Sequence, residues 1–226
     1  MTVFERLDGV SVRVPVGDIL LNGDLAFSPA STGVVLFAHG SGSSRHSPRN
    51  RLVAHLLEQD GFGTLLMDLL TEDEDEIDRR SAQLRFDIDL LAARLTGVVD
   101  WLHEQPRTAA LPIGLFGAST GAAAALVTAA DRPRSVAAVV SRGGRPDLAG
   151  HALPRVTAPT LLIVGSLDTA VLQMNRDAMA RMRGPAALEI VEGATHLFEE
   201  PGALSEVAEI ASDWFQTYLK PRPSTN

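Results

Sequence analysis

The sequence contains no cysteine, and this absence excludes disulfides, thiolate nucleophiles and cysteine-based metal sites. No stretch approaches the roughly 18 consecutive apolar residues of a membrane-spanning helix. The first residues show no cationic start followed by an apolar run, so we predict no signal peptide. Basic charge is also in deficit, since the formal net charge is -8, which argues against binding to nucleic acid. We therefore expect a soluble cytoplasmic protein without a nucleic-acid or membrane partner.

The length of 226 residues and the 45% content of hydrophobic residues suit one domain with a full core. We predict a single domain over residues 1–226, with entry strands in residues 1–30 and a frayed tail at 221–226. A homodimer and a monomer are both compatible with this composition.

Short apolar runs alternate with helical patterns through most of the chain. This alternation predicts a mostly parallel sheet with helices on both faces. The runs that we assign to strands are residues 33–38, 63–68, 111–116, 136–140, 160–164 and 188–191.

Three other segments give more local predictions. Residues 19–27 form two short runs around Asn22-Gly23, which predicts a β-hairpin and an antiparallel entry to the sheet. The acidic stretch 71–78 is expected to be a solvated surface loop. Apolar residues from Leu84 to Leu102 recur at helical spacing, so a long helix is expected there.

The run that ends in Gly117-Ala118-Ser119-Thr120-Gly121 is followed at once by a helix of small residues. This layout is typical of a nucleophile elbow, in which a sharp strand–turn–helix exposes a serine hydroxyl. Gly-x-Ser-x-Gly by itself occurs by chance in many chains, and the flanking strand and helix give it weight. Ser119 is therefore the candidate nucleophile.

A serine needs an imidazole to take its proton and a carboxylate to orient that imidazole. Asp168 follows the strand at 160–164, and His196 follows the strand at 188–191. The order Ser, Asp, His is the chain order of an α/β-hydrolase triad. Asp147, which also follows a strand, is a rival for the acid, and we prefer Asp168 because it closes a short turn directly after its strand.

The loop after residues 33–38 is rich in glycine and serine. A tetrahedral intermediate needs two donors for its oxyanion, and we assign them to the backbone amides of Thr120 and Ser41. Gly40 and Gly42 allow this backbone to bend close to a ligand.

Four motifs together make the sequence resemble the α/β-hydrolase superfamily and, within it, the small lidless hydrolases related to dienelactone hydrolase. The resemblance extends from about Gly33 to Leu219 and implies esterase chemistry without a metal or a cofactor. It departs from dienelactone hydrolase itself, whose nucleophile is a cysteine where this chain has Ser119, so the lactone substrate does not carry over. The motifs are Phe37-Ala38-His39-Gly40-Ser41-Gly42, Gly117-Ala118-Ser119-Thr120-Gly121, Gly165-Ser166-Leu167-Asp168 and Gly193-Ala194-Thr195-His196-Leu197-Phe198.

The residues from 144 to 159 are too few for a helical lid, so the predicted site is open to water and suits small or medium soluble esters. Three arginines in strand-end loops, Arg45, Arg142 and Arg145, are candidates to hold a substrate carboxylate, with His39 as a further substrate-binding candidate. The alternative role of these arginines is pairing with Asp147 or with the acidic stretch.

We expect a serine hydrolase that cleaves carboxylic esters or thioesters through an acyl-enzyme. A peptidase or an acyltransferase on the same triad is the alternative among enzymes. A non-catalytic binding module that keeps the fold is the alternative from another class.

Overall fold

A computed structural model describes residues 9–220, so the predicted tail at 221–226 lies outside the described residues. Within this range one eight-stranded sheet has the strand order β1-β2-β4-β3-β5-β6-β7-β8. From β3 to β8 neighbouring strands are parallel, and β2 runs antiparallel to both β1 and β4. The strands are β1 (Val10–Val16), β2 (Ile19–Ala26), β3 (Val34–Ala38), β4 (Gly63–Met67), β5 (Ile113–Ala118), β6 (Val136–Arg142), β7 (Thr160–Gly165) and β8 (Ala186–Val191).

The antiparallel entry to the sheet is confirmed, but the predicted position of its turn is wrong. Val16 pairs with Ile19, so the chain turns at Gly17 and Asp18, where Gly17 has a φ of +58°. Asn22 and Gly23 lie inside β2 instead. Gly23 faces Met67, whose Sδ would lie 2.5 Å from an added Cβ. Gly23 thus takes part in the pairing of β2 with β4 and not in the turn.

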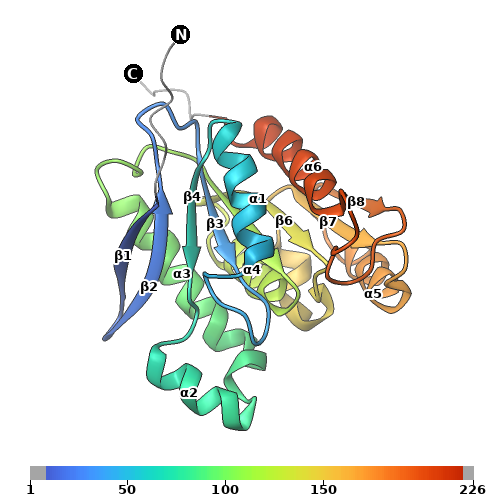
Figure 1. Ribbon diagram of the computed structural model, residues 1–226, viewed down its shortest axis with the longest axis horizontal. Helices are drawn as coiled ribbons and strands as arrows, with labels where there is room; N and C mark the ends of the chain where they lie inside the picture. Colours follow the sequence, from blue (N-terminus) through green and yellow to red (C-terminus); the bar gives the residue numbers. More distant parts are fainter. Residues whose placement is uncertain (1–8, 221–226) are drawn as a thin grey trace.

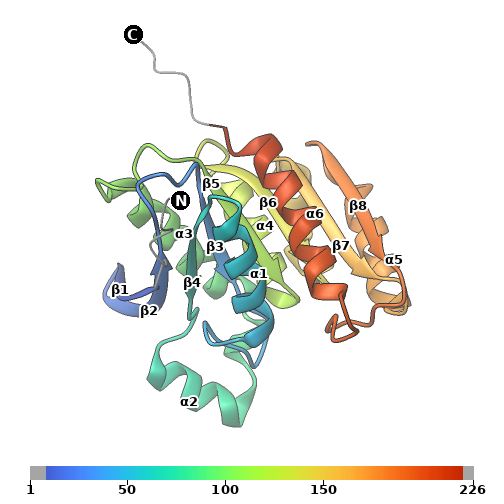
Figure 2. The same ribbon diagram turned by 45° about the horizontal axis from the view of Figure 1, so that its top comes forward.

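Helices cover both faces of the sheet, as predicted (Figures 1 and 2). On one face, α1 (Pro48–Gln59) and α6 (Ala203–Tyr218) share an apolar core with alternate residues of the strands. On the other face, α3 (Ile88–Glu104) and α4 (Thr120–Asp131) bury the opposite residues, and α5 (Thr169–Met179) packs on β7 and β8. The continuous apolar strands of the sequence are thus strands buried on both sides.

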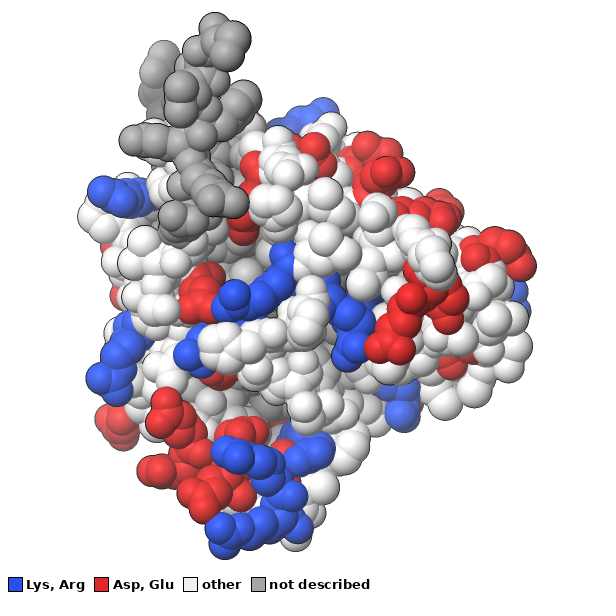
Figure 3. All heavy atoms as spheres, in the orientation of Figure 1, with Lys and Arg blue, Asp and Glu red and all other residues white. Residues whose placement is uncertain are grey.

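The stretch 71–78 was expected to be a loop, and the structure corrects this: α2 spans Glu72–Ser81. Thr71 and Glu74 form a capping box, and four acidic residues in the first turn interact favourably with the positive end of the helix. The expected long helix begins only at Ile88, after a short 3-10 helix, η1 (Leu84–Phe86). Figure 1 shows α2 projecting where β4 ends, and Figure 3 shows acidic and basic side chains gathered there.

The carboxyl ends of the parallel strands meet at one edge of the sheet, where open α/β sheets bind ligands. The segment after β6 forms the 3-10 helix η2 (Pro146–Arg155), and no helical lid is evident within residues 9–220. Of the helices in the described range, none has the length and apolarity needed to cross a membrane.

Candidate active site

Ser119 stands between the end of β5 and the start of α4, in a strained turn. Its φ of 51° and ψ of -120° are rarely adopted by a residue with a side chain, and such strain typically costs about 1–3 kcal/mol. A Cβ on Gly117 would lie 2.7 Å from the Ala122 nitrogen, and one on Gly121 would lie 2.5 Å from the His39 carbonyl oxygen. Only glycine fits at these two positions, so the predicted strand–turn–helix is present at Ser119.

The backbone of Ser119 is bound on both sides by the last residue of β6 and the segment that follows it. Its amide donates to the Arg142 carbonyl at 3.3 Å, and its carbonyl accepts from the Arg145 amide at 3.0 Å. This segment therefore fixes the position of Ser119 relative to β6.

His196 and Asp168 come together from two other strand ends. The Asp168 Oδ2 atom lies 2.6 Å from His196 Nδ1, within hydrogen-bonding distance. The side chain of His196 is 39% exposed and that of Asp168 is 15% exposed, so the imidazole remains accessible while its partner is mostly covered. The rival acid, Asp147, forms two hydrogen bonds with the Arg145 guanidinium, at 2.9 and 2.7 Å.

Gly143 connects these two groups of residues. It directly follows Arg142, whose carbonyl accepts from the Ser119 amide. A Cβ on Gly143 would lie 3.1 Å from the His196 carbonyl oxygen and 3.5 Å from Nδ1 of its ring. The histidine loop thus packs on the segment that holds Ser119.

The loop after β3 approaches the same serine from the opposite side. A Cβ on Gly40 would lie 3.0 Å from the Cβ of Ser119. Ser41 and Thr120 both line a cavity of about 110 Å³, so the two predicted oxyanion donors belong to residues at one hollow. Thr120 opens α4, where the first amides have no acceptor within the helix.

His39 anchors this loop. Its Nδ1 lies 2.9 Å from the Gly40 carbonyl oxygen, and its Nε2 accepts from the Leu69 amide at 3.2 Å. These contacts correspond to a neutral ring with the proton on Nδ1. Burial, opposed by the Gly40 hydrogen bond and by nearby Asp68 and Asp75, lowers the pKa of His39 from its ordinary 6.5. Both ring nitrogens are engaged by the backbone, which leaves neither free for a substrate.

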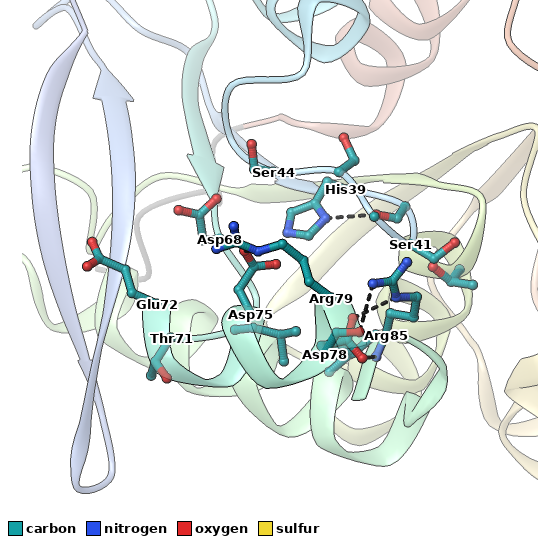
Figure 4. A pocket seen from close by; sticks show the side chains of 16 residues that line it. His39, Ser41, Ser44, Asp68, Thr71, Glu72, Asp75, Asp78, Arg79 and Arg85 are labelled. Atoms are coloured by element: carbon teal, nitrogen blue, oxygen red, sulfur yellow. Dashed lines mark hydrogen bonds and ion pairs between the residues drawn. The ribbon is translucent and has the colours of Figure 1, made fainter. Parts of the chain in front are cut away.

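The far wall of the cavity is charged and comes from α2 and the end of β4. Figure 4 shows Arg79 reaching from α2 toward Asp68 and Asp75. Asp78 is buried and binds Arg85 through Oδ2 at 2.6 Å, and its pKa is lowered because the Arg85 and Leu84 hydrogen bonds outweigh the effect of burial. Arginines therefore balance much of the acidic charge on this wall.

The three candidate arginines have different surroundings. Arg45 pairs with Asp68, which also accepts from the Arg45 amide at 2.8 Å. Arg145 pairs with Asp147, whose hydrogen bonds raise the pKa of the guanidinium. Arg142 is only 7% exposed, and burial together with the charge of Arg49 lowers its pKa to about 10. The pairing alternative thus describes Arg145, which pairs with Asp147, whereas Arg45 pairs with Asp68, outside the acidic stretch, and Arg142 differs from both.

Two buried asparagines near the site were not identified from the sequence. Asn175 of α5 donates to the carbonyls of Gly144 and Val171, at 3.0 and 2.8 Å. Asn50 of α1 accepts from Arg142 Nη2 at 3.3 Å. Each asparagine lies among the buried residues of its helix, so a polar residue on an otherwise apolar face was the available signal.

The sheet order, the covering helices and the serine turn define the class of this protein as an α/β-hydrolase, which confirms the predicted fold. Residues 23–220 match the model of the dienelactone hydrolase family, and the chain belongs to this family. It is similar to the solved dienelactone hydrolase of Anabaena variabilis, with 59% identity over 94% of this chain and 98% of that chain and a TM-score of 0.92. This is the family that the sequence motifs resembled.

More distant structures share the fold. Est1E from Butyrivibrio proteoclasticus has a TM-score of 0.76 at 16% identity, over 92% of this chain and 98% of that chain. The esterase Pf2001 of Pyrococcus furiosus has a TM-score of 0.74 at 18% identity, over 94% and 92% of the two chains.

Two proteins from two strains of Mycobacterium tuberculosis are 57% identical over 214 residues and carry the provisional name phosphoribosyl transferase. The match covers 94% of this chain but 47% of each relative, so the chain spans about half the length of these curated relatives.

Proposed function

We propose that this hydrolase cleaves carboxylic esters, with thioesters as the related class, through an acyl-enzyme on Ser119. One observation carries the proposal: the Asp168–His196 pair, at 2.6 Å, lies beside the segment that binds both sides of the Ser119 backbone. A nucleophile, a base and a group that orients the base are the parts that serine catalysis needs.

In the proposed reaction the Ser119 hydroxyl oxygen attacks the acyl carbon while His196 Nε2 takes its proton. Asp168 holds Nδ1–H and stabilises the imidazolium, and the amides of Thr120 and Ser41 bind the oxyanion. The C–O bond to the alcohol then breaks, and His196 returns the proton to the leaving oxygen. Water, deprotonated by His196, attacks the acyl-enzyme and releases the carboxylic acid and free Ser119.

The substrate side of the proposal follows from the loops around the serine. Without a helical lid in the described range, the site suits small or medium soluble esters. Of the four substrate-binding candidates, His39, Arg45 and Arg145 are engaged within the protein, and Arg142 has no carboxylate partner among its contacts. We therefore retain Arg142 as the candidate that binds a carboxylate of the substrate.

The provisional name of the mycobacterial relatives does not alter this proposal. This chain matches only about half of those proteins. In this chain the matched residues contain a nucleophile elbow and an Asp–His pair, which suit acyl transfer to water. We propose ester hydrolysis, and not phosphoribosyl transfer, for this segment.

Labelling with a fluorophosphonate tests the proposal, because the reagent bonds to a serine activated by its histidine. The wild-type protein should be labelled and Ser119→Ala should not. An unlabelled wild-type protein that is correctly folded would point to a non-catalytic binding module. Comparison of p-nitrophenyl acetate with the matching anilide separates an esterase from a peptidase, and an added alcohol acceptor that diverts the acyl group would indicate an acyltransferase.

A further inference from the structure

The Arg142 guanidinium is buried on the face of the sheet that α1 and α6 cover. Its Nη2 donates to Asn50 Oδ1 at 3.3 Å, and its Cζ lies 5.9 Å from the centre of the Phe198 ring. Its Nε and Nη1 atoms are buried and meet no hydrogen-bond partner among the described residues. Two of the three nitrogens of a buried cation therefore have donors available for another group.

Among the ion pairs formed within residues 9–220, none involves Arg142, and the charge that acts with burial to lower its pKa is that of a second arginine, Arg49. The Nε atom of Arg49 is also buried without a partner, while its Nη1 donates to Glu199 at 3.0 Å. The first turn of α1, which carries Arg49, contains no acidic residue, so the partial positive charge of this helix end adds to the two guanidinium charges.

Burying a charge without a counter-charge is costly, and a protein normally supplies a partner for it. The chain does this for Arg145, three residues further on, which has a bidentate bond to Asp147. A guanidinium presents a planar fork of donors that matches a carboxylate or a phosphate. Figure 3 shows basic side chains crossing the middle of the face on which α1 and α6 lie.

We propose that Arg142 and Arg49 form a binding site for a compact oxyanion, a carboxylate or a phosphate, between α1 and the loop that carries His196. The anion has two possible sources. It is either the acid group of an ester substrate, which rests on the proposed function, or a free anion, which does not. In both cases the anion contacts a loop that includes Phe198, whose φ of 56° is strained, and so influences the placement of His196.

Isothermal titration calorimetry with sodium phosphate and with sodium acetate, at constant ionic strength, tests the site directly. We expect saturable binding to the wild-type protein at millimolar concentrations and at least about tenfold weaker binding to Arg142→Gln and to Arg49→Gln, because each removes a charged donor. Glu199→Gln should bind no more weakly than wild type, since it releases Arg49 from its carboxylate. Arg155→Gln is the matched control: it removes one positive charge from an exposed pair with Asp131 and should leave binding unchanged.

The proposal is overturned if neither anion binds the wild-type protein, or if Arg142→Gln and Arg49→Gln bind both anions as well as wild type does. If water molecules bind the free donors of Arg142 in place of an anion, neither anion will bind the wild-type protein. If Arg142→Gln does not fold, two other variants decide the question: Arg142→Lys, which keeps the charge and loses the fork, and Arg49→Gln, at a half-buried position.

Kinetics separate the two sources of the anion. The substrates are p-nitrophenyl butyrate, which is neutral, and p-nitrophenyl hemisuccinate, which carries a carboxylate. If the substrate supplies the anion, Arg142→Gln lowers kcat/KM about tenfold or more for the hemisuccinate alone, and phosphate competes with that ester. If a free anion binds, both esters are affected equally and phosphate raises the wild-type rate on both.

Failure of the proposed function has a different signature. In that case the wild-type protein turns over neither ester and takes no fluorophosphonate label, while the calorimetry still reports whether Arg142 and Arg49 bind an anion.

Discussion

Ser119 and His196 lie at the same edge of the sheet but are held there by different means. Backbone sterics and two backbone hydrogen bonds fix the serine, and glycines are required around it because a Cβ has no space. The histidine loop also has a backbone bond, from the Leu167 amide to the Ala194 carbonyl, but three side-chain contacts add to it: Asp168 to His196, Thr195 to Glu200, and Arg49 to Glu199. The serine region should therefore respond to substitution through folding, and the histidine region through activity.

The largest expected effect concerns the histidine region. Asp168→Asn should lower kcat by roughly 10³–10⁴-fold, because the amide no longer holds the imidazole in the right tautomer or stabilises its charge. Thermal unfolding should change little. Steady-state kinetics on a p-nitrophenyl ester measures the loss, and Asp147→Asn, which breaks only the contact with Arg145, is the control. An equal loss of kcat in the two variants would make Asp147 a candidate again for the acid that orients His196.

The next effect concerns the serine region and should appear in stability. Gly121→Ala places a Cβ against the carbonyl groups of Ala38 and His39, so we expect at least about 4 kcal/mol of destabilisation, or no folded protein. Gly193→Ala in the histidine loop is the matched control. It has open space and a φ of +73°, so it should cost about 1 kcal/mol. Similar urea midpoints for the two variants would refute this distinction.

Asn175 connects the two regions, since it binds Gly144 in the segment between Ser119 and His196. Asn175→Ala removes the side-chain donor that the Gly144 and Val171 carbonyls share and should destabilise the fold by about 2–3 kcal/mol. Because the segment also positions Ser119, kcat should fall with little change in KM. Asn175→Ser, which retains a donor, should recover part of both. A stability loss with unchanged kcat would show that the asparagine acts on folding alone.

The smallest expected effect is a dependence of the stability on pH through His39. The neutral form of this histidine holds the loop that carries Ser41. Its pKa in the folded protein is below the ordinary 6.5, so the unfolded chain binds a proton first as the pH falls. The stabilisation is complete above pH 6.5 and is lost progressively as the pH falls toward the folded pKa. Urea titrations at several pH values give the free energy of unfolding. In this window it should change less steeply with pH for His39→Gln than for wild type. An unchanged slope would show that another group is responsible.

Much of the fold was predictable because strands buried on both faces leave continuous apolar runs. The two errors have different causes: in one, pairing with a distant strand overrides a local turn signal, and in the other, a local capping signal outweighs the charge of the stretch. Asn22-Gly23 is a strong turn sequence, yet both residues lie in β2, where they pair with β1 and Gly23 also pairs with Met67 of β4. The charge of the acidic stretch favours a solvated loop, but a capping box at Thr71 and Glu74 starts a helix there.

The sequence itself determined the serine turn, since the glycines on both sides of Ser119 act over a few residues and need no distant partner. It also determined the order of Ser119, Asp168 and His196 along the chain. The tertiary structure was needed to show which acid meets His196 and which of the three arginines has no carboxylate partner within residues 9–220. Both depend on side chains from separate strands and helices, and the distances between these are set by the packing of the whole sheet and not by spacing along the chain.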